Sequence, residues 1–361
     1  MLDFKLPFSQ IRNRKSEIAN ILRLASCVFL MACLILPAQG RGPGTSGSTA
    51  LKIGIGARST GMGEASVAVA GDVSSIYWNP AGLFQIQGSQ LSAMHMEWLD
   101  DIRYEWVGYA QPLASWGTIA ADVSYVHMGD IVRTLESATE GYEENGIVTA
   151  ADVAGRVAFA SKVYRGVVVG ASFQMLQSKV DFENVTKERM DDRTAKSTAI
   201  GIGVLYDTPV PNLSAGCSFQ NLGSQTEAFI SKKEPLPFAF RMGAAYKTVV
   251  RGWKSEQPKE EETEEPIDSD VNLDRTPGTL VAAMDLDFPA DNSPGIRMGL
   301  EYQFGNGIAV RGGYRTGTGL DFSDGFSGGM GYTTATYQVN YALVPYGDIG
   351  NTHRISFTIR F

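Results

Sequence analysis

The chain ends in His353-Arg354-Ile355-Ser356-Phe357-Thr358-Ile359-Arg360-Phe361, and this stretch decides the fold class. Isoleucine and phenylalanine occupy every second position, and arginine, serine and threonine occupy the positions between them. A strict period of two is what a β-strand with one apolar face requires. A terminal phenylalanine closing such a strand is typical of outer-membrane β-barrels, although a soluble β-sandwich could end in the same way.

Three upstream stretches repeat the alternation, at residues 296–304, 308–315 and 337–343. A soluble all-β domain and a membrane barrel both fit it. In a sandwich the large aromatic side chains belong in mid-strand, whereas in a membrane barrel they gather at strand ends as interfacial girdles. The aromatic residues at or near strand ends here are Tyr302, Phe304, Tyr314, Tyr332, Tyr346 and Phe361. This distribution favours the membrane barrel.

The pattern predicts an all-β fold, a 14-stranded antiparallel transmembrane β-barrel in the cell outer membrane, over residues 88–361. The predicted strands are 88–98, 102–112, 116–127, 150–163, 166–181, 197–207, 213–221, 237–248, 279–288, 295–304, 307–315, 323–332, 335–345 and 351–361. Short turns would then lie at the periplasmic end, and the longer segments 128–149, 182–196 and 222–236 would be outer loops.

An acidic segment at residues 249–278 interrupts this regularity at a predicted periplasmic turn. A charge run of this kind is most often a solvated loop. A partner-docking segment remains an alternative. So does a missed strand before Leu236, which would move the segment to the outer side.

Composition narrows the class of protein. Mean hydropathy is -0.09, and after residue 40 no stretch approaches the roughly 20 apolar residues of a membrane-spanning helix. Residues 1–40 have a basic start, a short apolar run and small residues at the end, which predicts a signal peptide. A retained anchor and a lipidated Cys33 are alternatives. Without residues 1–40, Cys217 is the one cysteine left, so we expect no intrachain disulfide.

The net charge argues against a nucleic-acid partner. Residues 41–361 contain 26 basic and 37 acidic side chains, a formal charge of -11. Nothing in this balance supplies the positive surface that phosphates require.

Residues 41–87, between the predicted signal and the first strand, are rich in small side chains, including Gly61 and Gly63, and could lie closely against another surface. Asn79-Pro80-Ala81-Gly82 predicts a turn, with Gly82 free to adopt a left-handed conformation. A plain linker would not need the large apolar residues Ile76, Tyr77, Trp78 and Leu83 around this turn. We therefore predict a plug or latch in the lumen of the barrel.

The stretch GARSTGMGEASVAVAGDVSSIYWNPAGL, residues 56–83, strongly resembles the opening of the PorV/PorQ family of outer-membrane proteins. These proteins are relatives of the FadL long-chain fatty acid transporters, which share the Asn-Pro-Ala-Gly element. Further similar stretches are Arg311-Gly312-Gly313-Tyr314-Arg315 and the segment from Val344 to Ser356. The resemblance covers nearly all of residues 50–361.

This resemblance implies a fourteen-stranded barrel with an N-terminal segment in the lumen. It also implies that the chain binds exported proteins in type IX secretion, with the translocon and its cargo as partners besides outer-membrane lipid. The alternative is a FadL-like channel for long-chain fatty acids or other hydrophobic molecules. An adhesive surface barrel is a third possibility. The acidic insertion at 249–278 departs from the family pattern.

The alternating strands also place charges on the face opposite the apolar one, where an arginine avoids the cost of about 2–4 kcal/mol that it would meet in mid-membrane lipid. The predicted lumen-facing charges are Arg297, Glu301, Arg311, Arg315, Arg354 and Arg360. They could form a network of paired charges that includes Glu301. Alternatively, Arg311 and Arg315 could attract a ligand carboxylate.

We expect no enzymatic activity, cofactor or metal site. The glycine-rich run from Gly54 to Gly63 follows no buried strand and is followed by no Walker lysine, so it does not indicate a nucleotide site. His95, His127 and His353 are scattered and belong to no nucleophile or metal-binding motif.

Overall fold

The computed structural model describes residues 42, 44–69, 71–99, 101–137, 141–185, 191–225, 233–250, 277–317 and 325–361. They belong to one compact unit, Gly42–Phe361. The predicted signal at 1–40 and almost all of the acidic segment lie outside the described residues. No described helix has the length and apolar composition needed to cross a membrane.

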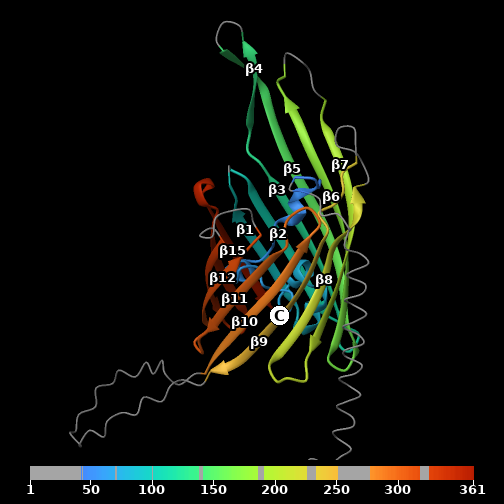
Figure 1. Cartoon of the computed structure of the whole chain (residues 1–361), viewed down its shortest axis with the longest axis vertical. Coiled ribbons are helices and arrows are strands. Elements are labelled where there is room, and N and C mark those ends of the chain that lie inside the picture. The colour runs from blue at the N-terminus through green and yellow to red at the C-terminus, as the bar shows by residue number, and fades with distance from the viewer. Residues whose placement is uncertain are drawn as a thin grey trace, which may run out of the picture. The chain divides into compact units, whose positions relative to one another are not determined.

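Antiparallel strands dominate the unit (Figure 1). They are β1 (Gln90–Glu97), β2 (Arg103–Pro112), β3 (Thr118–His127), β4 (Ile131–Ser137), β5 (Gly141–Tyr164), β6 (Val167–Glu183), β7 (Arg193–Asp207), β8 (Leu213–Gln225), β9 (Ala239–Val250), β10 (Gly278–Pro289), β11 (Gly295–Gln303), β12 (Ile308–Arg315), β13 (Phe326–Thr333), β14 (Tyr337–Pro345) and β15 (Asn351–Arg360). Because β1 pairs with β15 and β3 pairs with β5, the ring closes. The prediction of a closed 14-stranded antiparallel barrel is confirmed. Among the described residues β4 pairs with β5 alone, so it stands outside the ring of fourteen strands.

The two faces of each strand differ as the alternation predicts. In β15, Ile355 is 51% exposed and Phe357 is 40% exposed, whereas Arg354 and Ser356 are buried. The apolar residues therefore face outward, where a membrane barrel meets lipid, and the polar residues face the enclosed interior. In a soluble sandwich the same apolar residues would have been buried.

Strand ends differ from the prediction mainly on one side of the ring. The predicted loops 128–149, 182–196 and 222–236 contain β4, the first part of β5 and the loop-side ends of β6, β7 and β8. These extensions rise beyond the other strands toward β4 (Figure 1). They were missed because both faces of a sheet beyond the membrane meet water, so a period of two is not imposed there.

The ends of the ring can be told apart by their connections. Residues 113–117, 165–166, 208–212, 304–307 and 334–336 form short connections at one end, which we call the turn end; the opposite end is the loop end. β9 runs toward the turn end and β10 leads away from it, and the described residues before Leu236 contain no additional barrel strand. The acidic segment therefore begins and ends at the turn end, as predicted.

The N-terminal segment, residues 44–86, contains four short helices: η1 (Thr49–Lys52), α2 (Ala57–Gly61), α3 (Ser75–Trp78) and η2 (Pro80–Gln85). A further short helix, η4 (Gly347–Ile349), lies between β14 and β15. Inward-facing apolar residues of the strands, such as Met96 and Trp106, join Ile55, Met62 and Ile76 of the segment in one buried core. The segment is thus packed inside the ring as part of the folded unit.

Candidate functional site

Gly61 at the end of α2, Gly63 just after it and glycines of three strands form the first attachment of the segment. A Cβ on Gly63 would lie 2.6 Å from the backbone O of Met298 and 2.6 Å from the backbone N of Tyr314. A Cβ on Gly61 would lie 3.1 Å from the Cα of Gly329. Gly63 also has a positive φ of 63°, which an L-residue rarely adopts. Backbone therefore packs directly on backbone here, against β11, β12 and β13.

The Asn79 to Gly82 motif forms the second attachment, on β6, β7 and β8. Asn79 Nδ2 donates to Val67 O at 2.7 Å and to Val204 O at 3.0 Å. Its Oδ1 accepts a hydrogen bond from Ala81 N at 3.1 Å, which caps η2. Pro80 occupies the first turn of this helix, where its missing N–H costs nothing. Gly82 does not have the left-handed conformation expected after a turn, because it lies within the helix η2.

Glycines in the wall make room for this motif. A Cβ on Gly170 of β6 would overlap Ala81 N, and a Cβ on Gly203 of β7 would overlap Asn79 Oδ1. A Cβ on Gly216 of β8 would lie 2.8 Å from Val67 O. The two attachments lie on opposite sides of the ring, since α2 contacts β12 to β15 and η2 contacts β5 to β7. The N-terminal segment therefore crosses the lumen between opposite walls.

Buried ion pairs support the first attachment. Glu301 of β11 accepts two hydrogen bonds from Arg58 of α2, at 2.8 and 2.7 Å, and a third from Arg311 at 2.5 Å. Arg58 also reaches Asp72 at 3.4 Å. The paired geometry of the guanidinium and the carboxylate gives directional hydrogen bonds in a site that is shielded from water.

A second group of charges surrounds Glu64. Arg297 lies 2.5 Å from Glu64 and 2.5 Å from Asp287, Arg315 lies 3.3 Å from Glu64, and Arg241 donates to Asp287 at 2.8 Å. Burial alone would raise the pKa of the Glu64 carboxyl group, but Arg315 and Arg297 favour its charged form and hold that pKa at about 2. Glu64 is therefore ionised at neutral pH and ties the segment to β11 and β12.

Arg354 holds the segment through neutral groups. Its Nη1 donates to Gly54 O and to Thr60 Oγ1, both at 2.8 Å. Its guanidinium carbon lies 5.5 Å from the centre of the Trp98 ring, which is a cation–π distance. Arg354 is only 1% exposed.

The larger of the two cavities described here, which we call the vestibule, has a volume of about 710 Å³. It lies at the loop end, because Trp98, Ile102, Met128 and Tyr346 from the connections there line it. Apolar residues, including Ile53 next to η1 and Val126 of β3, form much of its wall. The charged residues that line it are Lys52, Glu64, Asp152, Lys179, Arg297, Arg315 and Arg354. This volume falls within the range that holds small organic ligands.

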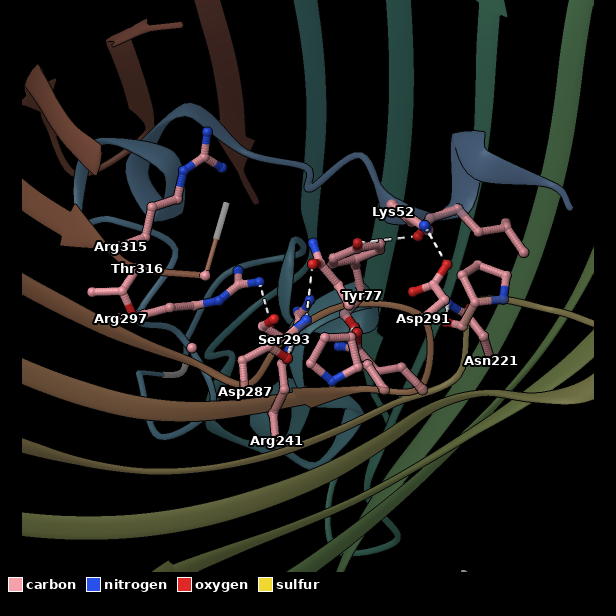
Figure 2. Close-up of a pocket in the computed structure, with 18 residues that line it drawn as sticks. Lys52, Tyr77, Asn221, Arg241, Asp287, Asp291, Ser293, Arg297, Arg315 and Thr316 are labelled. Atoms are coloured by element: carbon pink, nitrogen blue, oxygen red, sulfur yellow. Dashed lines mark hydrogen bonds and ion pairs between the residues drawn. The ribbon is translucent and has the colours of Figure 1, made fainter. Parts of the chain in front are cut away.

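A second cavity of about 150 Å³, the side cavity, lies next to the vestibule and shares Lys52, Arg297 and Arg315 with it. Figure 2 shows that Arg241, Asp287 and Arg297 meet on one side of it, and that Lys52 pairs with Asp291 on the other. Polar atoms form a larger share of its lining than of the wall of the vestibule.

The structure separates the predicted site residues into two groups. Gly61, Gly63 and the Asn79 to Gly82 motif lie at the two attachments, and all the predicted lumen charges face inward. Arg311 and Arg315 do not act on a shared space, because Arg311 is bound to Glu301 and only Arg315 lines the vestibule.

Sequence reasoning missed the residues that complete these sites. They are Arg58, Glu64, Arg241, Asp287 and the glycines Gly170, Gly203, Gly216, Gly299 and Gly313. The glycines left a signal, since each takes an inward position in a strand. Within the described part of the chain, no group of three or more His, Cys, Asp or Glu residues is arranged to hold a metal ion.

Comparisons with known proteins support the fold. The sequence profile described as "Uncharacterised protein family (UPF0164)" matches residues 36–250. No curated protein sequence matches the chain. The toluene transporter TbuX of Ralstonia pickettii is similar in structure, with a TM-score of 0.51 and 13% identity over 85% of this chain and 98% of that one. The toluene transporter TodX of Pseudomonas putida has a TM-score of 0.53 and 13% identity over 85% of this chain and 99% of that one. A closed barrel of this fold with an apolar outer face belongs in the outer membrane.

Proposed function

The chain belongs to the uncharacterised protein family UPF0164, and we propose that it takes up hydrophobic small molecules across the outer membrane. The observation that carries this proposal is the vestibule of about 710 Å³ at the loop end, whose wall is mostly apolar in area and also carries charged side chains. Ligand sites of small molecules have this composition. Two barrels of the same fold are named as toluene transporters, which supports a hydrophobic ligand.

In this proposal the N-terminal segment acts as a plug. It is fastened to both walls, so a ligand first binds in the vestibule and passes inward only when the plug rearranges. The charged part of the vestibule suits a ligand with one acidic end, such as a fatty acid, because Arg297, Arg315 and Arg354 outnumber Glu64 and Asp152 among the residues that line it.

Filling the vestibule should prevent binding. Ala150 of β5 lines this cavity, and we expect Ala150→Trp to weaken binding of both oleate and toluene by about tenfold or more, a loss of about 1.4 kcal/mol. Ala121→Trp is a matched control, because Ala121 is exposed on the outer face of β3. Titration calorimetry on the purified protein measures both variants. Equal affinities for wild type and Ala150→Trp would exclude the vestibule as the ligand site.

Transport of exported proteins, which the resemblance to the PorV/PorQ family suggests, is the second candidate function. The observation that favours it is the wall of β4 to β7, which extends beyond the other strands at the loop end (Figure 1). Deletion of the gene separates the two functions: type IX substrates would accumulate in the periplasm if the chain serves secretion, whereas uptake of a hydrophobic nutrient would fall if it is a channel.

A further inference from the structure

The side cavity carries an excess of positive charge that the uptake of hydrophobic molecules does not explain. The pair of Lys52 and Asp291 is neutral. The other charged residues that line the cavity are Arg241, Arg297 and Arg315 against Asp287. Outside the lining, Glu64 pairs with Arg297 and Arg315, and Asp285 accepts a hydrogen bond from the backbone N–H of Val67. The three guanidinium groups that line the cavity are therefore paired with two carboxylates, Asp287 and Glu64.

Arg241 also has a buried donor to spare. Its side chain is 7% exposed and its Nε donates to Asp287 at 2.8 Å. Its Nη1 is buried and has no hydrogen-bond partner among the described residues. A buried guanidinium N–H without an acceptor is costly, and such groups normally indicate an unplaced water or ion.

The cavity has room for an anion. Its volume of about 150 Å³ far exceeds the roughly 10–15 Å³ that one water requires by the same measure. Ser293 and Thr316 line it together with the cationic groups (Figure 2) and supply neutral donors, as does Asn292. Guanidinium groups prefer planar or tetrahedral oxyanions, which accept two hydrogen bonds at once.

We propose that the side cavity binds a small oxyanion of the size and charge of phosphate or sulfate, with Arg241 as its principal ligand. Lys52 belongs to η1 of the N-terminal segment, whereas Arg241, Arg297 and Arg315 belong to β9, β11 and β12. The anion therefore links the segment to the wall at the loop end. It adds a third attachment between the two glycine-lined ones.

Inorganic phosphate tests this on the full chain purified in detergent. We expect phosphate to raise the unfolding temperature relative to chloride at equal ionic strength, because a ligand of the folded state stabilises it. Arg241→Gln should abolish the increase. Arg156→Gln should retain it, because Arg156 is a buried lumenal arginine on β5 that does not line the side cavity.

If Arg241→Gln does not fold, Ser293→Ala provides a second test of the site. Its fold should be intact, since no ion pair depends on the Ser293 hydroxyl group. Calorimetry with phosphate should show an affinity about fivefold weaker for Ser293→Ala than for wild type. An equal increase with chloride, or no heat of phosphate binding to the wild type, would overturn the proposal. Dodecyl phosphate is the second probe: if it binds and inorganic phosphate does not, the site accepts the headgroup of an amphiphile and no free anion. If the wild-type protein binds phosphate but neither oleate nor toluene, only the proposed uptake function is refuted.

Discussion

The substitution Gly313→Val should open the lumen. A Cβ on Gly313 would overlap the backbone N of Gly63 and lie 2.5 Å from its Cα. Both neighbours are backbone atoms of the segment, so no side chain can move aside, and the segment must leave β12. We expect the conductance of the purified protein in planar bilayers to rise by about tenfold or more, since the N-terminal segment then loses its packed contact with the wall.

Gly312→Val is the matched control for this prediction. Gly312 is the adjacent residue on β12, and a Cβ there meets nothing within 4 Å. The conductance of the Gly312→Val variant should equal that of the wild type. If Gly313→Val forms a folded barrel with wild-type conductance, the segment does not obstruct the lumen.

Replacing Glu301 with glutamine should cause the largest loss of stability among the lumenal charges. Glu301 is 4% exposed and neutralises both Arg58 and Arg311. Its loss leaves the buried Arg311 without a carboxylate and Arg58 with Asp72 alone, which costs about 3–5 kcal/mol. Urea unfolding of the protein in lipid vesicles measures the change in the free energy of unfolding.

Two further variants show whether burial causes this loss. Glu105→Gln removes an exposed carboxylate paired with His95, a change worth about 0–1 kcal/mol. Replacing Arg58, Glu301 and Arg311 together by Met, Leu and Met should restore most of the stability, because apolar groups leave no unpaired charge. A Glu301→Gln loss no larger than that of Glu105→Gln would mean that the ion pairs do not hold the segment.

The sequence predicts the barrel well where lipid touches it. Along β15 the hydrocarbon requires apolar residues at alternate positions, so Ile355 and Phe357 reveal both the strand and its orientation. Along β4 and the first part of β5 no hydrocarbon imposes this pattern, so the sequence predicts a loop where the structure has strands. The alternation of apolar and polar residues therefore indicates which strands face lipid more reliably than it indicates which segments are hydrogen-bonded as strands.

The site was less accessible to sequence reasoning for a different reason. The alternation within each strand is enough to show which arginines face the lumen. It does not show which residues they pair with: Arg58 and Glu301 are 243 residues apart, and their contact depends on how the segment crosses the ring. The glycines that receive Asn79 and Ala81 were missed for the same reason.

The central claim is that the N-terminal segment is an integral part of the filled lumen, and hydrogen–deuterium exchange tests it most directly. The backbone N–H groups of Thr60, Glu64, Asn79 and Gly82 all donate to backbone oxygens within the segment. In the protein reconstituted in lipid, we predict that peptides from residues 59–82 exchange as slowly as those from β11 and β12. Complete exchange of these peptides within seconds, while the strands stay protected, would contradict it.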